Sequence, residues 1–223
     1  GLEGLEPGRN LEIDPTLTAS RTDELDELPD DELDEFPDDE LPRTGEDVEA
    51  GLTVRWGITP NLTLTGTVNP DFSQVEADVA QLNVNERFEL FFEEKRPFFL
   101  EGVDFFSTPI NAVHTRTVAD PDWGAKLTGK QGKNAIGVFA TEDTLNNLIF
   151  PSNQGSDFTS LDDDILGSVV RYRRDVGTGT TIGVLYTGRE GDEYHNRVAG
   201  IDAFVRLSDA DTVNVQYLHS DTL

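Results

Sequence analysis

Apolar and polar side chains alternate residue by residue along the last third of the chain. Between Val198 and Leu207, one face carries Ala199, Ile201, Ala203, Val205 and Leu207, and the other carries Gly200, Asp202, Phe204 and Arg206. After a turn at Ser208–Asp211, the residues Val213, Val215 and Tyr217 alternate with Thr212, Asn214 and Gln216. Successive side chains of a β-strand point to opposite faces, so a period of two predicts strands with one apolar and one polar face.

The same period recurs upstream, with turn residues between the runs. Asn10–Ser20 is the first strand candidate, and Val48–Ile58 forms a predicted hairpin with 62–68 across Pro60–Asn61. A further pair flanks the turn Gln131–Asn134, whereas Asp143–Asp164 is predicted to be a long polar loop. About nine strands, mostly of eight to eleven residues, predict an all-β, antiparallel up-and-down meander.

A soluble sandwich and a membrane β-barrel both produce such alternation. Two features favour the barrel: neighbouring strands pair an apolar face with a polar face, and Trp56, Trp123, Tyr172, Tyr186 and Tyr217 lie near strand ends or turns. No apolar run approaches about 18 residues, which excludes a helical membrane protein. Bacterial barrels have even strand numbers and no open edge in lipid. We therefore expect residues 1–223 to form the N-terminal part of a larger outer-membrane barrel, as an open curved sheet.

Carboxylates dominate the stretch Asp23–Pro42, where ELPDDELD (Glu27–Asp34) is echoed by EFPDDELP (Glu35–Pro42). Like charges interrupted by proline resist helix and sheet, so residues 21–47 are predicted to be an acidic low-complexity loop. The loop is a candidate partner for Ca²⁺ or another cation, although no complete Ca²⁺-loop motif is present. Adaptation to a salty environment explains the charge equally well. The net charge of −27 excludes nucleic acid as a partner.

Residues 69–102 combine phenylalanine with charge at high density. Five phenylalanines (Phe88, Phe91, Phe92, Phe98 and Phe99) lie among eight charged residues. Aromatic rings favour burial, whereas so many charges must pair or stay hydrated. An ordered segment that lines a polar cavity satisfies both demands, and a loop-and-helix excursion packed over a sheet is the alternative. We predict that residues 69–118 form a lumenal or rim segment.

This segment also holds the candidate ligand-binding cluster. Its members are Glu76, Asp78, Arg87, Glu93, Glu94, Lys95, Arg96 and Glu101. The preferred interpretation is that they tie the segment to the inner wall through charge-assisted bonds, with solute binding and catalysis as alternatives. The chain has no cysteine, and His114, His195 and His219 are widely spaced. No catalytic residue and no cofactor are predicted, and the pattern leaves metal binding open.

Five stretches resemble the outer-membrane β-barrel family catalogued as domain of unknown function 5916. They are LEPGRNLEIDP (Leu5–Pro15), GLTVRWGITPNLTLTGTVNPDF (Gly51–Phe72), NPDFSQVEAD (Asn69–Asp78), FFEEKRPFFLEG (Phe91–Gly102) and DWGAKLTGK (Asp122–Lys130). The resemblance implies location in the outer membrane of a Gram-negative-type bacterium, downstream of a periplasmic module similar to family-nine carbohydrate-binding domains. It also implies that Pro60–Asn61 faces the periplasm and that the acidic loop lies outside the cell.

The hypothesis is an outer-membrane β-barrel fragment that binds or passes a solute, with outer-membrane lipid as its surroundings. A glycan is the candidate solute by association with the family's usual module. The alternatives are a structural or surface-interaction barrel with a sealed lumen, and a membrane-associated glycan hydrolase.

Overall fold

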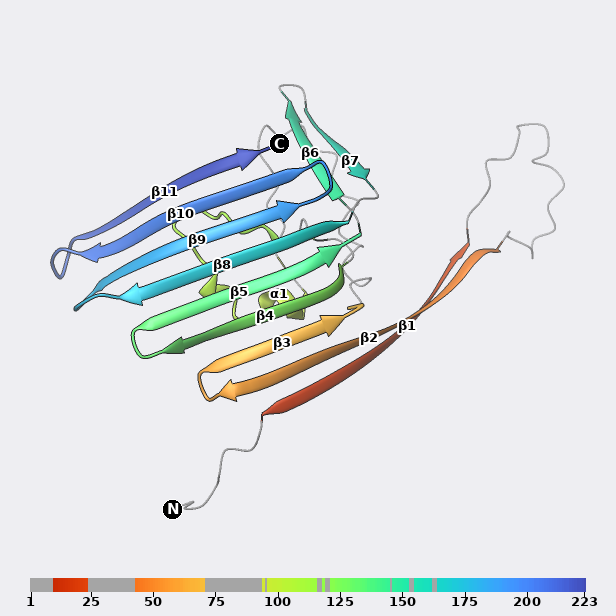
Figure 1. Cartoon of the computed structure of the whole chain (residues 1–223), viewed down its shortest axis with the longest axis horizontal. Coiled ribbons are helices and arrows are strands. Elements are labelled where there is room, and N and C mark those ends of the chain that lie inside the picture. The colour runs from red at the N-terminus through yellow and green to blue at the C-terminus, as the bar shows by residue number, and fades with distance from the viewer. Residues whose placement is uncertain are drawn as a thin grey trace, which may run out of the picture.

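The computed structural model describes residues 10–23, 43–70, 94, 96–115, 118, 121–144, 146–152, 155–161 and 164–223. Within these residues the main element is a single antiparallel sheet of nine strands in the order β1-β2-β3-β4-β5-β8-β9-β10-β11 (Figure 1). The strands are β1 (Leu11–Asp23), β2 (Arg43–Thr59), β3 (Leu62–Val68), β4 (Pro121–Gln131), β5 (Asn134–Asp143), β8 (Ile165–Asp175), β9 (Thr180–Glu190), β10 (His195–Arg206) and β11 (Thr212–Thr222). The predicted all-β, open antiparallel meander is confirmed.

Helical structure is confined to two short pieces in the described residues, α1 (Pro97–Leu100) and the 3₁₀ turn η2 (Val103–Phe105). No helix among the described residues has the length and apolar character needed to cross a membrane.

Two segments differ from the sequence prediction. The stretch Asp143–Asp164, predicted as a loop, contains a separate hairpin of β6 (Asn146–Ser152) and β7 (Gly155–Leu161). Strands β1 and β2 also pair further than expected, up to Asp23 and Arg43, so they extend into both ends of the predicted acidic loop. Residues 24–42, which hold the proposed cation site, lie outside the described residues.

Short turns gather at one end of the sheet (Figure 1). They are Pro60–Asn61, Gly132–Lys133, Val176–Gly179 and Leu207–Asp211. Glycines at positive φ permit two of them: Gly132 (φ 59°) in the β4–β5 turn and Gly177 (φ 68°) in the β8–β9 turn. The connections with the acidic stretch, the Phe-rich segment and the β6–β7 hairpin all leave from the opposite end.

The two faces of the sheet differ sharply in polarity. Most apolar residues of the alternation lie on the convex outer face, where Ile201, Val213 and Val215 are 59%, 40% and 57% exposed. Threonine, charged residues and glycine predominate on the concave inner face, where Thr65, Lys126 and Arg171 are buried. The late strands therefore do not lie in a compact two-layer core.

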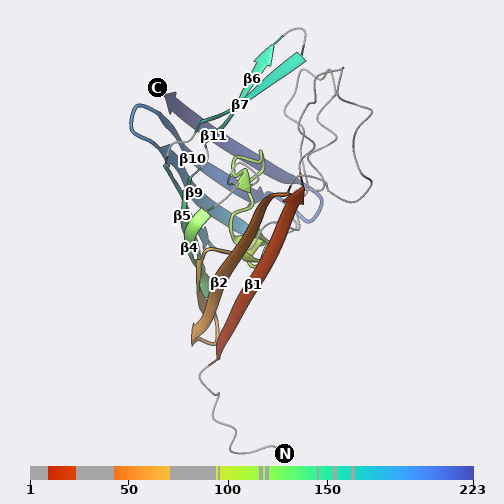
Figure 2. The same ribbon diagram turned by 90° about the vertical axis from the view of Figure 1, so that its right-hand side faces the viewer.

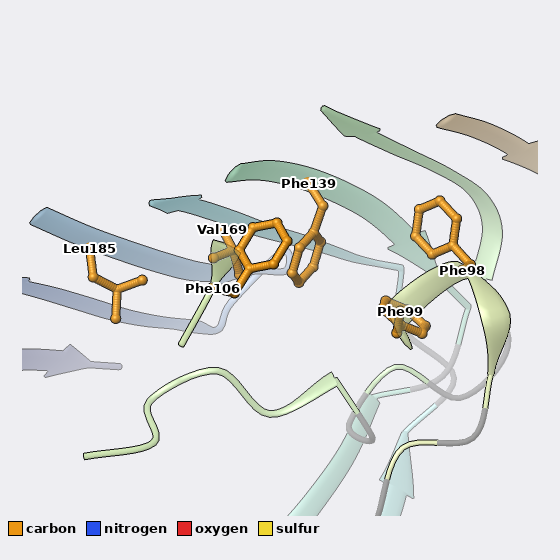
Figure 3. Packing of buried hydrophobic residues seen from close by; sticks show 6 residues of the cluster. All are labelled: Phe98, Phe99, Phe106, Phe139, Val169 and Leu185. Carbon is orange, nitrogen blue, oxygen red and sulfur yellow. The ribbon is translucent and has the colours of Figure 1, made fainter. Parts of the chain in front are cut away.

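Residues 96–106, a described part of the Phe-rich segment, cover part of the inner face. Figure 2 shows the curved sheet from its side, with α1 and the following residues inside the curve. Phe98, Phe99 and Phe106 pack there against Phe139 of β5, Val169 of β8 and Leu185 of β9 (Figure 3). This one-sided cluster is the apolar core of the described residues.

Candidate functional site

Residues Arg96–Asn111, here called the strap, cross the inner face from one side of the sheet to the other. Near its start, the Glu101 carboxylate accepts a hydrogen bond of 2.9 Å from Nε of Arg55 on β2. Near its end, the backbone N–H of Ile110 donates to Oε1 of Gln216 on β11 at 2.6 Å. The strap therefore touches strands that are seven places apart in the sheet order.

The start of the strap is held by a buried ion pair between Glu94 and Arg96. The guanidinium donates from Nε to Oε1 at 2.8 Å and from Nη2 to Oε2 at 2.8 Å, and it lies 4.4 Å from the centre of the Phe99 ring. It also donates to the backbone carbonyls of Thr115 at 2.8 Å and Val118 at 2.5 Å. One side chain thus ties together the two ends of the segment 94–118.

The same bonds set the protonation of Glu94. Burial raises the pKa of this carboxyl group, but hydrogen bonds from Arg96 and from the Thr115 hydroxyl outweigh burial and lower it from 4.5 to about 2. Glu94 is therefore a carboxylate throughout the physiological pH range and acts as a permanent anchor for Arg96.

Lys126 of β4 fixes the middle of the strap. Its ammonium group donates to the carbonyls of Phe98 and, at 2.6 Å, of Glu101, which are the orphan acceptors at the end of α1. The same group lies 5.0 Å from the centre of the Phe98 ring. A cation at a helix C-terminus is favourable. Here it also links the strap to the concave inner face of the sheet, which is called the wall below.

Two glycines of the inner face make room for the strap. A Cβ at Gly124 would lie 2.9 Å from the Phe98 ring, and a Cβ at Gly137 would lie 2.9 Å from the Phe106 ring. Any larger residue at either position would push an aromatic ring off the wall. The absence of side chains at Gly124 and Gly137 therefore leaves the space in which the Phe98 and Phe106 rings pack.

The wall beneath the strap has a buried ion pair of its own. Arg171 of β8 reaches across β9 to Asp202 of β10 with bonds of 2.5 and 2.9 Å, and the two side chains are 1% and 10% exposed. The guanidinium passes over Gly183, where a Cβ would collide with it. Next to this pair, Arg173 donates to the carbonyl of Asp104 in the strap at 3.1 Å.

Three of the predicted cluster residues are described, and each is tied to a structural contact. Glu94 binds Arg96, and Glu101 binds Arg55, which also binds Glu12 at 2.7 Å. Glu76, Asp78, Arg87, Glu93 and Lys95 lie outside the described residues. With an arginine on each of Glu94 and Glu101, the arrangement is suited to holding the segment in place.

Sequence reasoning missed the wall side of these contacts: Arg55, Lys126, Arg171 and Asp202, with Gly124 and Gly137. A signal was available, because all six lie on the polar face of the alternation, where charge and glycine are unusual for a buried position. The three histidines do not meet: His195 binds Asp221 at 3.2 Å, and His114 and His219 are exposed elsewhere. Among the described residues, no group of three or more His, Asp or Glu could hold a metal ion.

Fold and site together define a class: a one-layer antiparallel β-meander with an apolar convex face and an inserted strap on its polar concave face. Residues 34–124 match the family model described as Domain of unknown function (DUF5916), and this match confirms the family resemblance carried by the sequence motifs. The matched range includes β2, β3 and the strap. No curated protein and no solved structure gives a match.

Proposed function

We propose that this chain forms part of the wall of an outer-membrane β-barrel whose lumen binds or passes a solute. The support comes first from the outer face, which is apolar and uncovered on a sheet only one layer thick. Soluble proteins rarely leave so large an apolar surface in water, whereas the lipid-facing side of a barrel requires one.

The outer apolar band shifts along the strands from one side of the sheet to the other. On β2 it runs from Ile58 to Val48, and on β11 it runs from Val213 to Tyr217. The registers place Trp56 of β2 and His219 of β11 in the same row of paired residues. On β2, the centre of the band lies about three residues from this row, on the side of the long connections. On β11, the centre of the band lies about four residues from the row, on the side of the short turns.

This shift amounts to about one residue per strand over seven steps between β2 and β11. With a rise of roughly 3.3 Å per residue and a spacing of roughly 4.8 Å between strands, it corresponds to a strand tilt of about 35°. Strands of transmembrane barrels tilt by roughly 35–45°. An exposed apolar band that crosses the ladder at this angle is the observation that carries the proposal.

The edge of the band agrees with a membrane boundary. Tyr186 and Tyr217 are the last large apolar residues on their strands before polar outer positions begin. Beyond them, Arg197 binds Glu190 at 2.6 Å and His195 binds Asp221. Aromatic residues followed by charged groups are typical of the interface between hydrocarbon and water.

The two ends of the sheet support an orientation. Barrels of the outer membrane have short periplasmic turns and longer extracellular connections. We therefore assign the end with Pro60–Asn61 and Gly132–Lys133 to the periplasm, and the end with the Phe-rich segment and the β6–β7 hairpin to the cell exterior.

For the lumen, passage or binding of a solute remains the preferred function, and a glycan is proposed through the family resemblance alone. A specific observation favours the sealed structural barrel as second candidate: the strap buries wall residues such as Thr65, Lys126 and Arg171 that would otherwise face the lumen.

The test is to reconstitute the full-length protein in lipid vesicles and to measure swelling in saccharides of graded size, against empty vesicles. Swelling with a size limit supports passage. Resistance of the inserted protein to carbonate extraction without swelling supports the sealed barrel. Quantitative extraction by carbonate would contradict the membrane assignment itself.

A further inference from the structure

We infer that the strap is a fixed cross-brace, which sets the curvature of the sheet and must be seated for the sheet to assemble, and is not a gate that leaves the wall. The inference rests on the proposed barrel but does not depend on passage of a solute.

The span of the strap is the first argument. Its contacts reach Arg55 on β2, Lys126 on β4, Arg173 on β8 and Gln216 on β11. The ladder of hydrogen bonds joins only adjacent strands, so it leaves the curvature of an open sheet weakly specified. Bonds from one rigid segment to several non-adjacent strands fix the distances between those strands on the concave side.

A second device acts on the same side. The Arg171–Asp202 pair joins β8 to β10 over Gly183, and both partners lie on the concave face. A contact that joins alternate strands on one face shortens that face, and the sheet then bends toward it. The strap and this pair therefore act in the same direction.

The depth of the contacts argues against a gate. A lid is drawn from weakly packed parts of a protein, with few buried contacts. Phe98, Phe99 and Phe106 are only 4–6% exposed, and the rings of Phe98 and Phe106 pack on Gly124 and Gly137. Arg96 also closes the base of the segment by binding residues 115 and 118. Release would have to break all of these contacts together.

The first arm of the test compares Lys126→Met with Lys133→Met in the full-length protein, refolded into detergent or lipid vesicles. Lys126→Met keeps most of the side chain but removes the donors to Phe98 and Glu101. Lys133 is exposed in the turn that follows the same strand, so the same substitution there is the control. We expect Lys126→Met to lower the rate of assembly, followed by gel mobility and circular dichroism, at least fivefold, and Lys133→Met to match the wild type.

The second arm fills the space that Phe106 occupies on the inner face of the sheet. A side chain at Gly137 would meet the Phe106 ring at 2.9 Å, so Gly137→Val should unseat the end of the strap without touching Lys126. Gly66→Val is the control, because a Cβ there meets nothing within 4 Å. We expect Gly137→Val to slow assembly at least fivefold and Gly66→Val to match the wild type.

The outcomes separate brace from gate. Assembly of Lys126→Met or Gly137→Val at the wild-type rate would overturn the brace, and faster swelling of these variants at an unchanged assembly rate would identify a gate. Slow assembly of both variants, with both controls unimpaired, supports the brace. If no variant swells at all, passage fails as a function, while the assembly rates still decide the inference.

Discussion

The Glu94–Arg96 pair shows how much of the site depends on a few side chains. Arg96 satisfies two backbone carbonyls, stacks on Phe99 and neutralises Glu94 in a place with little water. Removing one member of such a pair leaves a buried charge alone, which is far more costly than the net value of the pair.

We expect Glu94→Gln to destabilise the protein in a pH-dependent way. Since the folded protein lowers the pKa of Glu94 from 4.5 to about 2, the carboxylate contributes roughly 3 kcal/mol above pH 4.5. This contribution is lost as the pH falls from about 4.5 to about 2. Urea unfolding of wild type and Glu94→Gln at several pH values measures it. The difference between the two proteins should be largest near pH 6 and vanish near pH 2, and a difference independent of pH would contradict the assignment.

Gly183 offers a second test at a single position. Gly183→Ala places a methyl group where Arg171 crosses to Asp202, so we expect a loss of at least about 2 kcal/mol in the free energy of unfolding. Gly66→Ala is the control, because a Cβ there meets nothing within 4 Å. Denaturant titration of both variants should separate them clearly. Equal stability would mean that the Arg171–Asp202 pair is unimportant.

At the scale of elements, the strands could be predicted because their signal is local. The alternation in Val198–Leu207 and Thr212–His219 matches β10 and β11 closely, and a turn of four residues joins the runs. The hairpin of β6 and β7 was not predicted, because the sequences NNLIFPS and GSDFTSL show no clear alternation of apolar and polar residues. Pairing overrode propensity there.

The contacts of the strap could not be predicted in the same way. Burial of Phe98 and Phe99 could be expected because their rings are apolar. The residues of the sheet that hold the strap, however, are 25 or more positions away in the sequence. Lys126 binds Glu101, and Gln216 binds Ile110. No short pattern specifies which strand a distant segment will cross. The sequence indicated that the charges of the segment would pair, but it did not identify Arg55 or Lys126 as partners.

The strap as an element should respond to loss of its central ring. Phe99 packs edge-on against Phe98 at 5.1 Å and Phe139 at 6.0 Å, so Phe99→Ala should cost about 3–5 kcal/mol. Val103→Ala is the control, because Val103 is half exposed on the same segment. Hydrogen exchange of the backbone amides at 98–106, measured together with the unfolding midpoint, should accelerate in Phe99→Ala alone.

For the whole molecule, the decisive question is whether the outer face of the sheet meets lipid. Val215 and Asn214 are neighbours on β11 with opposite orientation, outer and inner. In the proposed barrel, Val215→Arg should destabilise the inserted protein by roughly 2–4 kcal/mol, whereas Asn214→Arg should insert normally. The fraction of protein that resists carbonate extraction measures the difference. Equal insertion of both variants would contradict a lipid-facing outer surface.

Because the apolar band descends across the ladder, a residue's pairing partner is a poor guide to its surroundings. Trp56 and His219 lie in the same row of paired residues, yet Trp56 lies within the apolar band and His219 lies beyond it. If charged substitutions were grouped by rows of paired residues, each group would mix harmful and harmless positions, and no pattern would be visible. Sorted along a diagonal, with one step per strand, the same data should resolve into a sharp zone of intolerance to charge.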